Sequence, residues 1–506
     1  MKTILPVLLA LLPFVAVASP ENSPAPAAEF LAALHEKDQL KRTEMLLVAA
    51  ESGIYPADLA LIHLTRAAVG VQHGERLRKL AEGRRGELIP AVLCCRSAEH
   101  ADRALFELLL AAWRNASKKK HTPFEAPLFR ELTASLVAQG CGMGEYAVLR
   151  PLLEELIRKD PEWRSKLPVS ALVEFYVSCA FATEGFELPQ PEWHKSPSEL
   201  RQSCIRLLDE LPKLLPDDAE DSGRLIGFFL RTEARPSAVA VALAYGRKHP
   251  DNALPILVMT AAETGEVKIV DSLKKFINPQ MFNDFRIRAL GSSGAFDEAL
   301  KALDGIADPA RRQALYLELV GKQGDPALKA KLARDPKSSL LPRGRILWLL
   351  DAAERLHDRG CFRDAEKLVT AELDKDPVLA NALGYVALVL GLDPKTAEAR
   401  IDRALERDPY NSAYLDSKAY ARYAAHDHAG AWEWMQKSLK TIDPMPSVAE
   451  ILEHAGDIRL VLGDKTRARE FYRAALKLAD GMEKHPGEAG FSLIRKRAKE
   501  KLEKLK

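Results

Sequence analysis

The stretch AEILEHAGDIRLVLGDKTRAREFYRAALKLAD, residues 449–480, decides how this chain folds. On both sides of Gly463-Asp464 the apolar residues recur every three or four positions, which is the pattern of an amphipathic helix. Gly463 followed by Asp464 interrupts this pattern, as expected of a turn. Small residues stand at defined places, Gly456 in the first half and Ala468 in the second. The stretch therefore predicts two helices joined by a short turn.

The same small residues recur at a nearly constant spacing earlier in the chain. Ala419 lies 37 residues before Gly456, and Ala431 lies 37 residues before Ala468. Gly384 precedes Ala419 by 35 residues. Two antiparallel helices approach closely only where small side chains face each other, so a repeated helix pair keeps such residues in register. Four helix pairs are predicted between residues 346 and 480.

This pattern resembles the tetratricopeptide repeat (TPR) family, whose unit is a helix pair of about 34 residues. The resemblance covers residues 346–480 and implies an all-α fold, an α-solenoid of stacked antiparallel helix pairs with a C-terminal capping helix. An unrelated helical bundle is the alternative. Lys418 departs from the pattern, because the family usually has leucine at this position.

The first 28 residues are interpreted as a targeting segment and a linker. Lys2, the apolar run Ile4–Val17 and the small-residue pattern Ala16-Val17-Ala18 are the parts of a secretory signal peptide, predicted at 1–18. An uncleaved anchor is the alternative, although the run is short for a span of about 20 residues. The Pro/Ala-rich residues 19–28 are expected to form a poorly ordered linker. The protein is therefore predicted to be exported, periplasmic or extracellular, with no transmembrane segment after cleavage.

Two helical regions are predicted between the linker and the repeats. Residues 29–223 have helical periodicity and are interpreted as degenerate repeats, with a hinge between the Pro-rich stretches 186–198 and 211–223. Residues 224–345 carry proline-bearing turns at intervals of 27 to 30 residues, which predicts shortened TPR-like helix pairs. These turns are His249-Pro250, Asn278-Pro279, Asp308-Pro309 and Asp335-Pro336.

Residues 481–506 predict a basic amphipathic helix. Ile494, Ala498, Leu502 and Leu505 fall on one face, and lysine and arginine surround it. The last repeat of a solenoid exposes an apolar side that needs a polar-backed lid, so this segment is predicted to be a capping helix. A membrane-surface helix is the alternative, but glutamates dilute its positive charge.

Composition and cysteine usage narrow the possible functions. Lys and Arg number 73 and Asp and Glu 71, so the net charge of +2 gives no field that would attract nucleic acid. Six cysteines without a CxxC motif, most of them in apolar helical segments, predict buried free thiols, with disulfides as the alternative. His426-Asp427-His428 are adjacent in a turn rather than spaced along a helix face, so no metal site or cofactor is predicted.

The TPR resemblance also implies where a partner would bind. In that family, fixed positions on each first helix line the inner wall of the solenoid. The corresponding positions here are Glu354, His357, Asn381, Tyr385, Leu388, Asp416, Tyr420, Tyr423, Glu453, Asp457 and Leu460. The acidic residues are expected to be exposed and to line up between the tyrosines, so the wall would prefer a basic or neutral extended segment. The alternative is that Tyr385 and Tyr420 only pack between repeats.

These observations predict a non-enzymatic exported scaffold that binds a protein or peptide in its groove, within an envelope-associated assembly. The alternative is an envelope enzyme or enzyme subunit, acting on a polysaccharide or on peptidoglycan, whose solenoid positions a polymer. A concave site with convergent titratable groups within residues 29–223 would favour that alternative.

Overall fold

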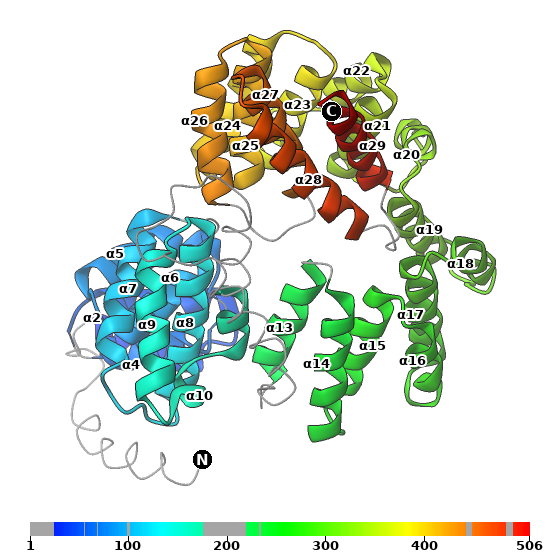
Figure 1. Ribbon diagram of the computed structural model, residues 1–506. Helices are drawn as coiled ribbons and strands as arrows, with labels where there is room; N and C mark the ends of the chain where they lie inside the picture. The colour runs from blue at the N-terminus through cyan, green and yellow to red at the C-terminus, as the bar shows by residue number, and fades with distance from the viewer. Residues whose placement is uncertain are drawn as a thin grey trace, which may run out of the picture. The chain divides into compact units, whose positions relative to one another are not determined.

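The computed structural model describes residues 25–505, except 55, 68, 99–101, 176–218, 232–233, 442–447 and 482–488. Every regular element in this part of the chain is a helix, and no strand occurs there (Figure 1). The prediction of an all-α fold is confirmed. None of the helices described has the length and apolar character that crossing a membrane requires. The predicted signal peptide lies outside the described residues.

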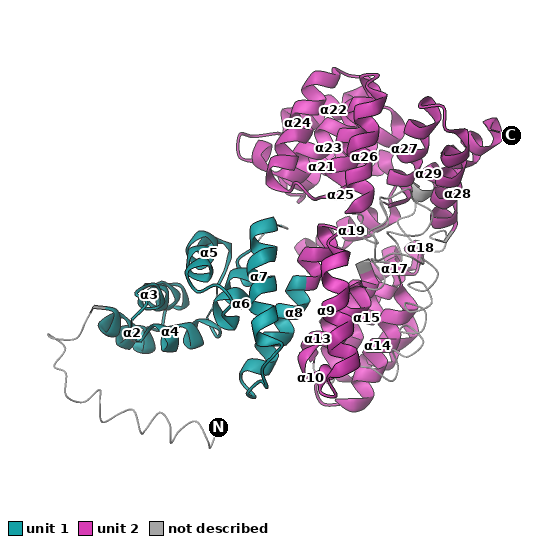
Figure 2. Ribbon diagram, turned by 60° about the vertical axis from the view of Figure 1, so that its left-hand side comes forward, with its two compact units in different colours: residues 1–136 teal, residues 137–506 magenta. Residues whose placement is uncertain are grey.

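The chain divides into two compact units, residues 1–136 and 137–506 (Figure 2). The boundary falls within helix α8, Glu125–Gly142. The hinge predicted from the sequence falls largely at residues 176–218, outside the described part, and stays a prediction.

The first unit is a set of short helices around a leucine-rich core. Leu46, Leu47, Leu61, Leu77 and Leu93 belong to this core and are buried. Its helices are α2 (Ala25–His35), α3 (Gln39–Glu51), α4 (Ala57–Leu64), α5 (Gly74–Gly83), α6 (Leu88–Arg96), α7 (Arg103–Ala116) and the start of α8, with a 3-10 turn η2 (Val71–His73). Helix α2 begins within the segment that the sequence assigned to the linker.

The second unit begins with helices of varied length. They are α9 (Tyr146–Lys159), α10 (Trp163–Lys166), α13 (Ala219–Arg231), α14 (Arg235–Lys248), α15 (Leu254–Thr264), α16 (Val267–Ser272), η4 (Lys274–Phe276), α17 (Pro279–Ser292), α18 (Phe296–Leu303), α19 (Pro309–Gln323) and α20 (Pro326–Arg334). Asn278 and Asp308 cap α17 and α19, and each is followed by a proline at the first helical position. These two proline-bearing turns therefore start helices, whereas His249 and Asp335 of the other two end α14 and α20.

The C-terminal array, residues 342–504, contains the regular repeats. Its first helices are α21 (Pro342–Leu356), α23 (Pro377–Val389), α25 (Ser412–Ala424) and α27 (Val448–Val461). Its second helices are α22 (Arg359–Lys367), α24 (Pro394–Arg407), α26 (His428–Lys440) and α28 (Lys465–Gly481), with a 3-10 turn η5 (Leu373–Lys375). Each first helix packs on its own second helix and on the neighbouring first helices. This stacking confirms the predicted solenoid of helix pairs.

Two glycines show why the helix pairs need small residues. A Cβ atom at Gly384 would lie 2.7 Å from the carbonyl oxygen of Ala397 in the partner helix. A Cβ atom at Gly456 would lie 2.5 Å from the ring of Tyr472. Both distances are shorter than any van der Waals contact, so only glycine permits this approach. Ala419 and Ala431, at the matching positions of the intervening pair, are fully buried.

Lys418 is buried although it carries a charge, with 3% of its surface exposed. Its ammonium group lies 2.7 Å from Glu398 and also pairs with Asp402, both on the preceding helix α24. The ring of Trp434 lies 5.8 Å from the same ammonium group. The two carboxylates compensate the cost of burying the charge, so lysine replaces the usual leucine without leaving an unpaired cation.

The last helix, α29 (Ala489–Lys504), covers the final repeat. Ile494 and Ala498 are buried, and Ile494 packs against Ala449, Leu478 and Ala479 of helices α27 and α28. The predicted capping helix is therefore present. Its basic residues have a further role, because two of them form ion pairs with helix α27.

Candidate functional site

Aromatic rings from three helices meet on the side of the array that the sequence assigned to the inner wall. The ring of Tyr420 on α25 lies 5.8 Å from Tyr385 on α23 and 5.9 Å from Tyr423, between ring centroids. The imidazole of His454 on α27 lies 4.7 Å from Tyr420 and 5.9 Å from Tyr385. Burial raises the pKa of Tyr420 to about 12, so the phenol stays protonated. The stacking of first helices thus gathers residues that are distant in sequence.

A buried ion pair joins α25 to α27 beneath these rings. Nδ1 of His454 lies 3.0 Å from Oδ2 of Asp416, and both side chains are almost inaccessible to solvent. Burial by itself would lower the pKa of His454. The Asp416 carboxylate outweighs burial, and the pKa rises to about 9. The imidazole is therefore a cation at neutral pH and donates to Asp416.

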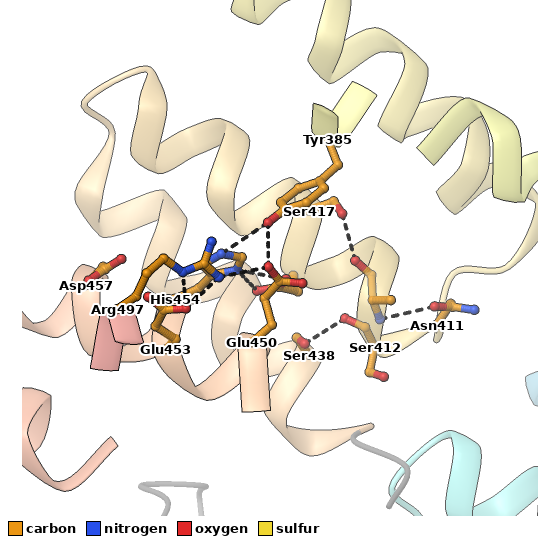
Figure 3. A network of polar contacts seen from close by, with 12 residues as sticks. Tyr385, Asn411, Ser412, Ser417, Ser438, Glu450, Glu453, His454, Asp457 and Arg497 are labelled. Carbon is orange, nitrogen blue, oxygen red and sulfur yellow. Dashed lines mark hydrogen bonds and ion pairs between the residues drawn. The ribbon is translucent and has the colours of Figure 1, made fainter. Parts of the chain in front are cut away.

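Three carboxylates of α27 face two cations of α29. Glu450, Glu453 and Asp457 are spaced by three and four residues, which places them on one helix face. The Arg497 guanidinium lies 3.1 Å from Glu450 and 2.7 Å from Glu453. The Lys501 ammonium lies 2.7 Å from both Glu453 and Asp457. Figure 3 shows Arg497 among the α27 side chains.

The cluster extends to helices α23 and α21. The hydroxyl of Tyr385 donates to Glu450 over 2.9 Å, and Figure 3 shows this contact. Burial, and then the charge of Glu450, raise the pKa of Glu354 on α21 to about 7. Within the described part of the chain, the Glu354 carboxyl forms neither a hydrogen bond nor an ion pair. Every other carboxyl group of the cluster has an ion-pair partner.

We call this cluster the acidic–aromatic face. It consists of Glu354, Tyr385, Asp416, Tyr420, Tyr423, Glu450, Glu453, His454 and Asp457. Most of the wall residues named from the sequence are among them, and they do lie together. The expectation that the acidic residues are exposed is wrong for two of them, since Asp416 is 5% exposed and Glu453 is 1% exposed. The cause is that His454 pairs with Asp416, while Arg497 and Lys501 pair with Glu453.

Other predicted wall residues do not join the face. His357 is exposed at the left-handed end of α21, with a φ of 50°, where it terminates the helix. Asn381 is half-buried, and its Oδ1 atom has no hydrogen-bond partner among the described residues. Leu388 belongs to the apolar core, and Leu460 is half-buried. The wall positions taken from the TPR resemblance are thus only partly those of the face.

Sequence reasoning missed four members of this arrangement. Glu450 and His454 were not singled out, and Arg497 and Lys501 were assigned only to a basic helix surface. A signal existed, because Glu450, Glu453 and Asp457 share one helix face and Arg497 and Lys501 are one turn apart. Opposite charges at matching helical spacing on two adjacent predicted helices are a pattern from which pairing could have been proposed.

An open cavity of about 620 Å³ lies in the first unit, between the α5–α6 and α7–α8 loops. Arg84, Asp58 and Glu87 line it, and Arg84 pairs with both carboxylates. Glu125 also lines it and accepts hydrogen bonds from the amide and hydroxyl of Thr122, which lower its pKa and cap α8. Its acidic residues thus serve local structure.

The remaining candidates have structural roles. Asp427 accepts from the amide of Gly430 and caps α26, and the preceding His426 has a φ of 61°. No group of three metal-ligating side chains is found among the described residues. Cys94, Cys95 and Cys361 are free thiols, and burial raises the pKa of Cys94 to about 11. The predicted thiols at Cys179 and Cys204 lie outside the described residues.

No known family profile matches the sequence, and no curated protein matches it. Solved structures do match. A tetratricopeptide repeat protein from Parabacteroides merdae is 14% identical, with a TM-score of 0.28 over 55% of this chain and 98% of that chain. Cut9–Hcn1, an APC/C hetero-tetramer, is 13% identical, with a TM-score of 0.33 over 97% and 98% of the two chains. Yeast Tom70 is 12% identical, with a TM-score of 0.30 over 94% and 96%.

Proposed function

We propose that this protein is an exported scaffold that binds a segment of a partner protein on the acidic–aromatic face, within an envelope-associated assembly. The observation that carries the proposal is the row of tyrosine rings, Tyr385, Tyr420 and Tyr423, which are partly buried against the apolar core and lie beside carboxylates. Tyrosine gives a large rigid contact area with a polar tip, and residues of this kind dominate the binding energy of protein interfaces.

The charges of the face select among partner segments. Asp457, together with Glu354 in its ionised form, would repel the terminal carboxylate of a ligand, whereas a basic or neutral segment meets complementary charge. The wall can therefore recognise a segment internal to a partner protein or an amine-bearing side chain. An acidic tail is the ligand that it disfavours most.

The test starts with capture of a partner from an envelope extract and its identification by mass spectrometry. The purified partner is then titrated against the wild type and against Tyr420→Ala with Tyr423→Ala. We expect the double variant to bind about 1–3 kcal/mol more weakly, because interface tyrosines carry much of the affinity. Tyr316→Ala with Tyr410→Ala, which removes two half-buried tyrosines outside the face, is the matched control. Equal affinities for all three proteins would place the binding surface elsewhere.

A charge variant tests the same surface through kinetics. Because Glu354 is less buried than Asp416, it is the better position for reversing the charge. Glu354→Lys should slow association with the captured partner and flatten its dependence on salt, since charges near an interface act mainly on the encounter rate. Association rates measured between 50 and 500 mM NaCl that match the wild type at every salt concentration would contradict a role for this carboxyl.

Export is proposed from the sequence of residues 1–18. Lys2, the apolar run and Ala16-Val17-Ala18 support cleavage after Ala18, so the mature protein should begin at Ser19. N-terminal sequencing of the protein expressed in a bacterial host with a periplasm is the measurement. Recovery of Met1 on the mature protein would contradict export by this route.

A further inference from the structure

Helix α29 is held to the array by a small apolar contact and by a larger set of charges. Ile494 and Ala498 are its buried residues, while Leu502 and Leu505, predicted to share that face, stay half-exposed. By contrast, α27 and α28 bury a continuous core that includes Leu452, Phe471 and other large side chains. The apolar core beneath α29 is therefore smaller than the core within the α27–α28 pair, although α29 also packs along α28, where Arg495 pairs with Asp480.

The charged attachment is specific in its spacing. Arg497 and Lys501, one turn apart, meet Glu450, Glu453 and Asp457 along α27. Ala498 lies next to Arg497 and permits the close approach of the two helices. The sequence pattern that fits the face is therefore Ile-x-x-Arg-Ala-x-x-Lys, from Ile494 to Lys501, in helical conformation.

The carboxyl groups of the face outnumber the cations that lie against them. Its carboxyl groups belong to Glu354, Asp416, Glu450, Glu453 and Asp457, whereas the cations against them are His454, Arg497 and Lys501. Glu354 in particular has no cation bonded to it within the described residues. A helix that presents the same two cations and one more would therefore bind this face more tightly than α29 does.

We propose that α29 is an internal occupant of the acidic–aromatic face, and that the external partner of this face is a basic amphipathic helix that replaces it. This inference rests on the proposed function and names the class of ligand. The covered form is the resting form, because the attached helix competes with any external helix at a high effective concentration. Binding of the partner is thus weakened by the chain's own C-terminal helix.

The experiment uses the full chain and a fluorescent peptide with the sequence of residues 489–506. Arg497→Glu with Lys501→Glu should release α29 from the face, so this variant should bind the peptide at least about ten-fold more tightly than the wild type. Lys499→Glu with Lys504→Glu makes the same charge change on exposed residues of α29 and should behave like the wild type. Peptide binding that is equal in all three folded proteins would overturn the proposal.

A second measurement on the wild type covers the case in which the release variant fails to fold. Amide hydrogen exchange of α29 and α28 is followed by mass spectrometry at low and high NaCl. If charges hold α29, its exchange should accelerate by about ten-fold in high salt, while that of α28 stays unchanged. Equal protection of both helices at both salt concentrations would mean that α29 is a fixed cap, and the proposal would fall.

The two proposals fail in different ways. If the captured partner binds the wild type and Arg497→Glu with Lys501→Glu equally, but loses affinity on Tyr420→Ala with Tyr423→Ala, the scaffold function stands and α29 is not a competitor. If the tyrosine variant binds the captured partner like wild type, the scaffold surface lies elsewhere, whatever the peptide does.

Discussion

The first unit and the C-terminal array differ in how far their charged side chains are exposed to solvent. In the first unit, Arg76 pairs with Glu44 and Glu51, and these three side chains are between a third and a half exposed. In the array, Asp416, Glu453 and His454 are almost wholly buried, and each has an oppositely charged partner. Exposed pairs contribute little to stability, whereas a buried charge that loses its partner is costly.

This difference indicates what the buried charges contribute to the array. An apolar core would hold the first helices together at least as well as buried charges do. Charged groups between the first helices instead determine which side chains lie opposite each other, and they give the face a defined electrostatic character. The first unit has its charges where they mainly keep the surface hydrated.

The largest effect is expected from removing one partner of the buried pair. Asp416→Ala leaves His454 buried without its counter-ion and should lower the unfolding free energy by about 3–5 kcal/mol, measured by urea denaturation. Asp416→Leu with His454→Phe removes both charges and should recover most of that loss. If the single variant is as stable as the wild type, the pair carries no such cost.

A smaller effect is expected where the helix pairs touch. Gly384→Ala places a methyl group against the carbonyl oxygen of Ala397 and the side chain of Ile401, and should lower stability by about 1–3 kcal/mol. Gly83→Ala in the first unit meets open space and should be neutral or stabilising by up to about 1 kcal/mol. Thermal unfolding of both variants is the measurement, and equal melting temperatures would contradict the close packing.

The pH dependence separates the array from the first unit. The pKa of His454 is about 9 in the folded protein and near 6.5 when unfolded, so its stabilising contribution is complete below about pH 6.5 and is lost as pH rises through 9. The groups around it are Asp416, Glu450, Glu453, Tyr385 and Tyr420. Between pH 6.5 and 9.5 we expect a loss of up to about 3 kcal/mol by urea denaturation. His454→Gln should flatten this slope; an unchanged slope would mean that another group causes it.

The smallest effect is expected in the first unit. Arg76→Ala removes contacts to Glu44 and Glu51, but these exposed pairs should contribute no more than about 1 kcal/mol to stability. Denaturation at low and high NaCl should show the small effect vanishing with salt. A loss as large as that of Asp416→Ala would erase the difference between the two regions.

The fold could be predicted because its determinants are local and periodic. Gly384, Ala419 and Gly456 mark the helix contacts by their spacing alone, and Gly463 marks the turn that the structure confirms between α27 and α28. The repeats before residue 342 were harder to predict, because their helices vary in length.

The site could be predicted only in part. Tyr385, Tyr420 and Asp457 followed from the TPR resemblance, which assigns fixed positions on each first helix to the inner wall. The pairing of Asp416 with His454 joins residues 38 positions apart, and that of Glu453 with Arg497 joins residues 44 apart. Such contacts depend on how closely successive helices converge, which periodicity does not determine. For that reason the burial of Asp416 and Glu453 was missed.

The hydrogen bond from Tyr385 to Glu450 has a mechanical consequence. In a solenoid each unit contacts only its neighbours, so under tension the units are expected to separate one at a time. This bond joins α23 to α27 across 65 residues and bypasses the intervening helix pair. It therefore links two helix pairs that are not neighbours in the array. Pulled from its two ends, the array should therefore stay stiff up to a threshold force and then open in a single step.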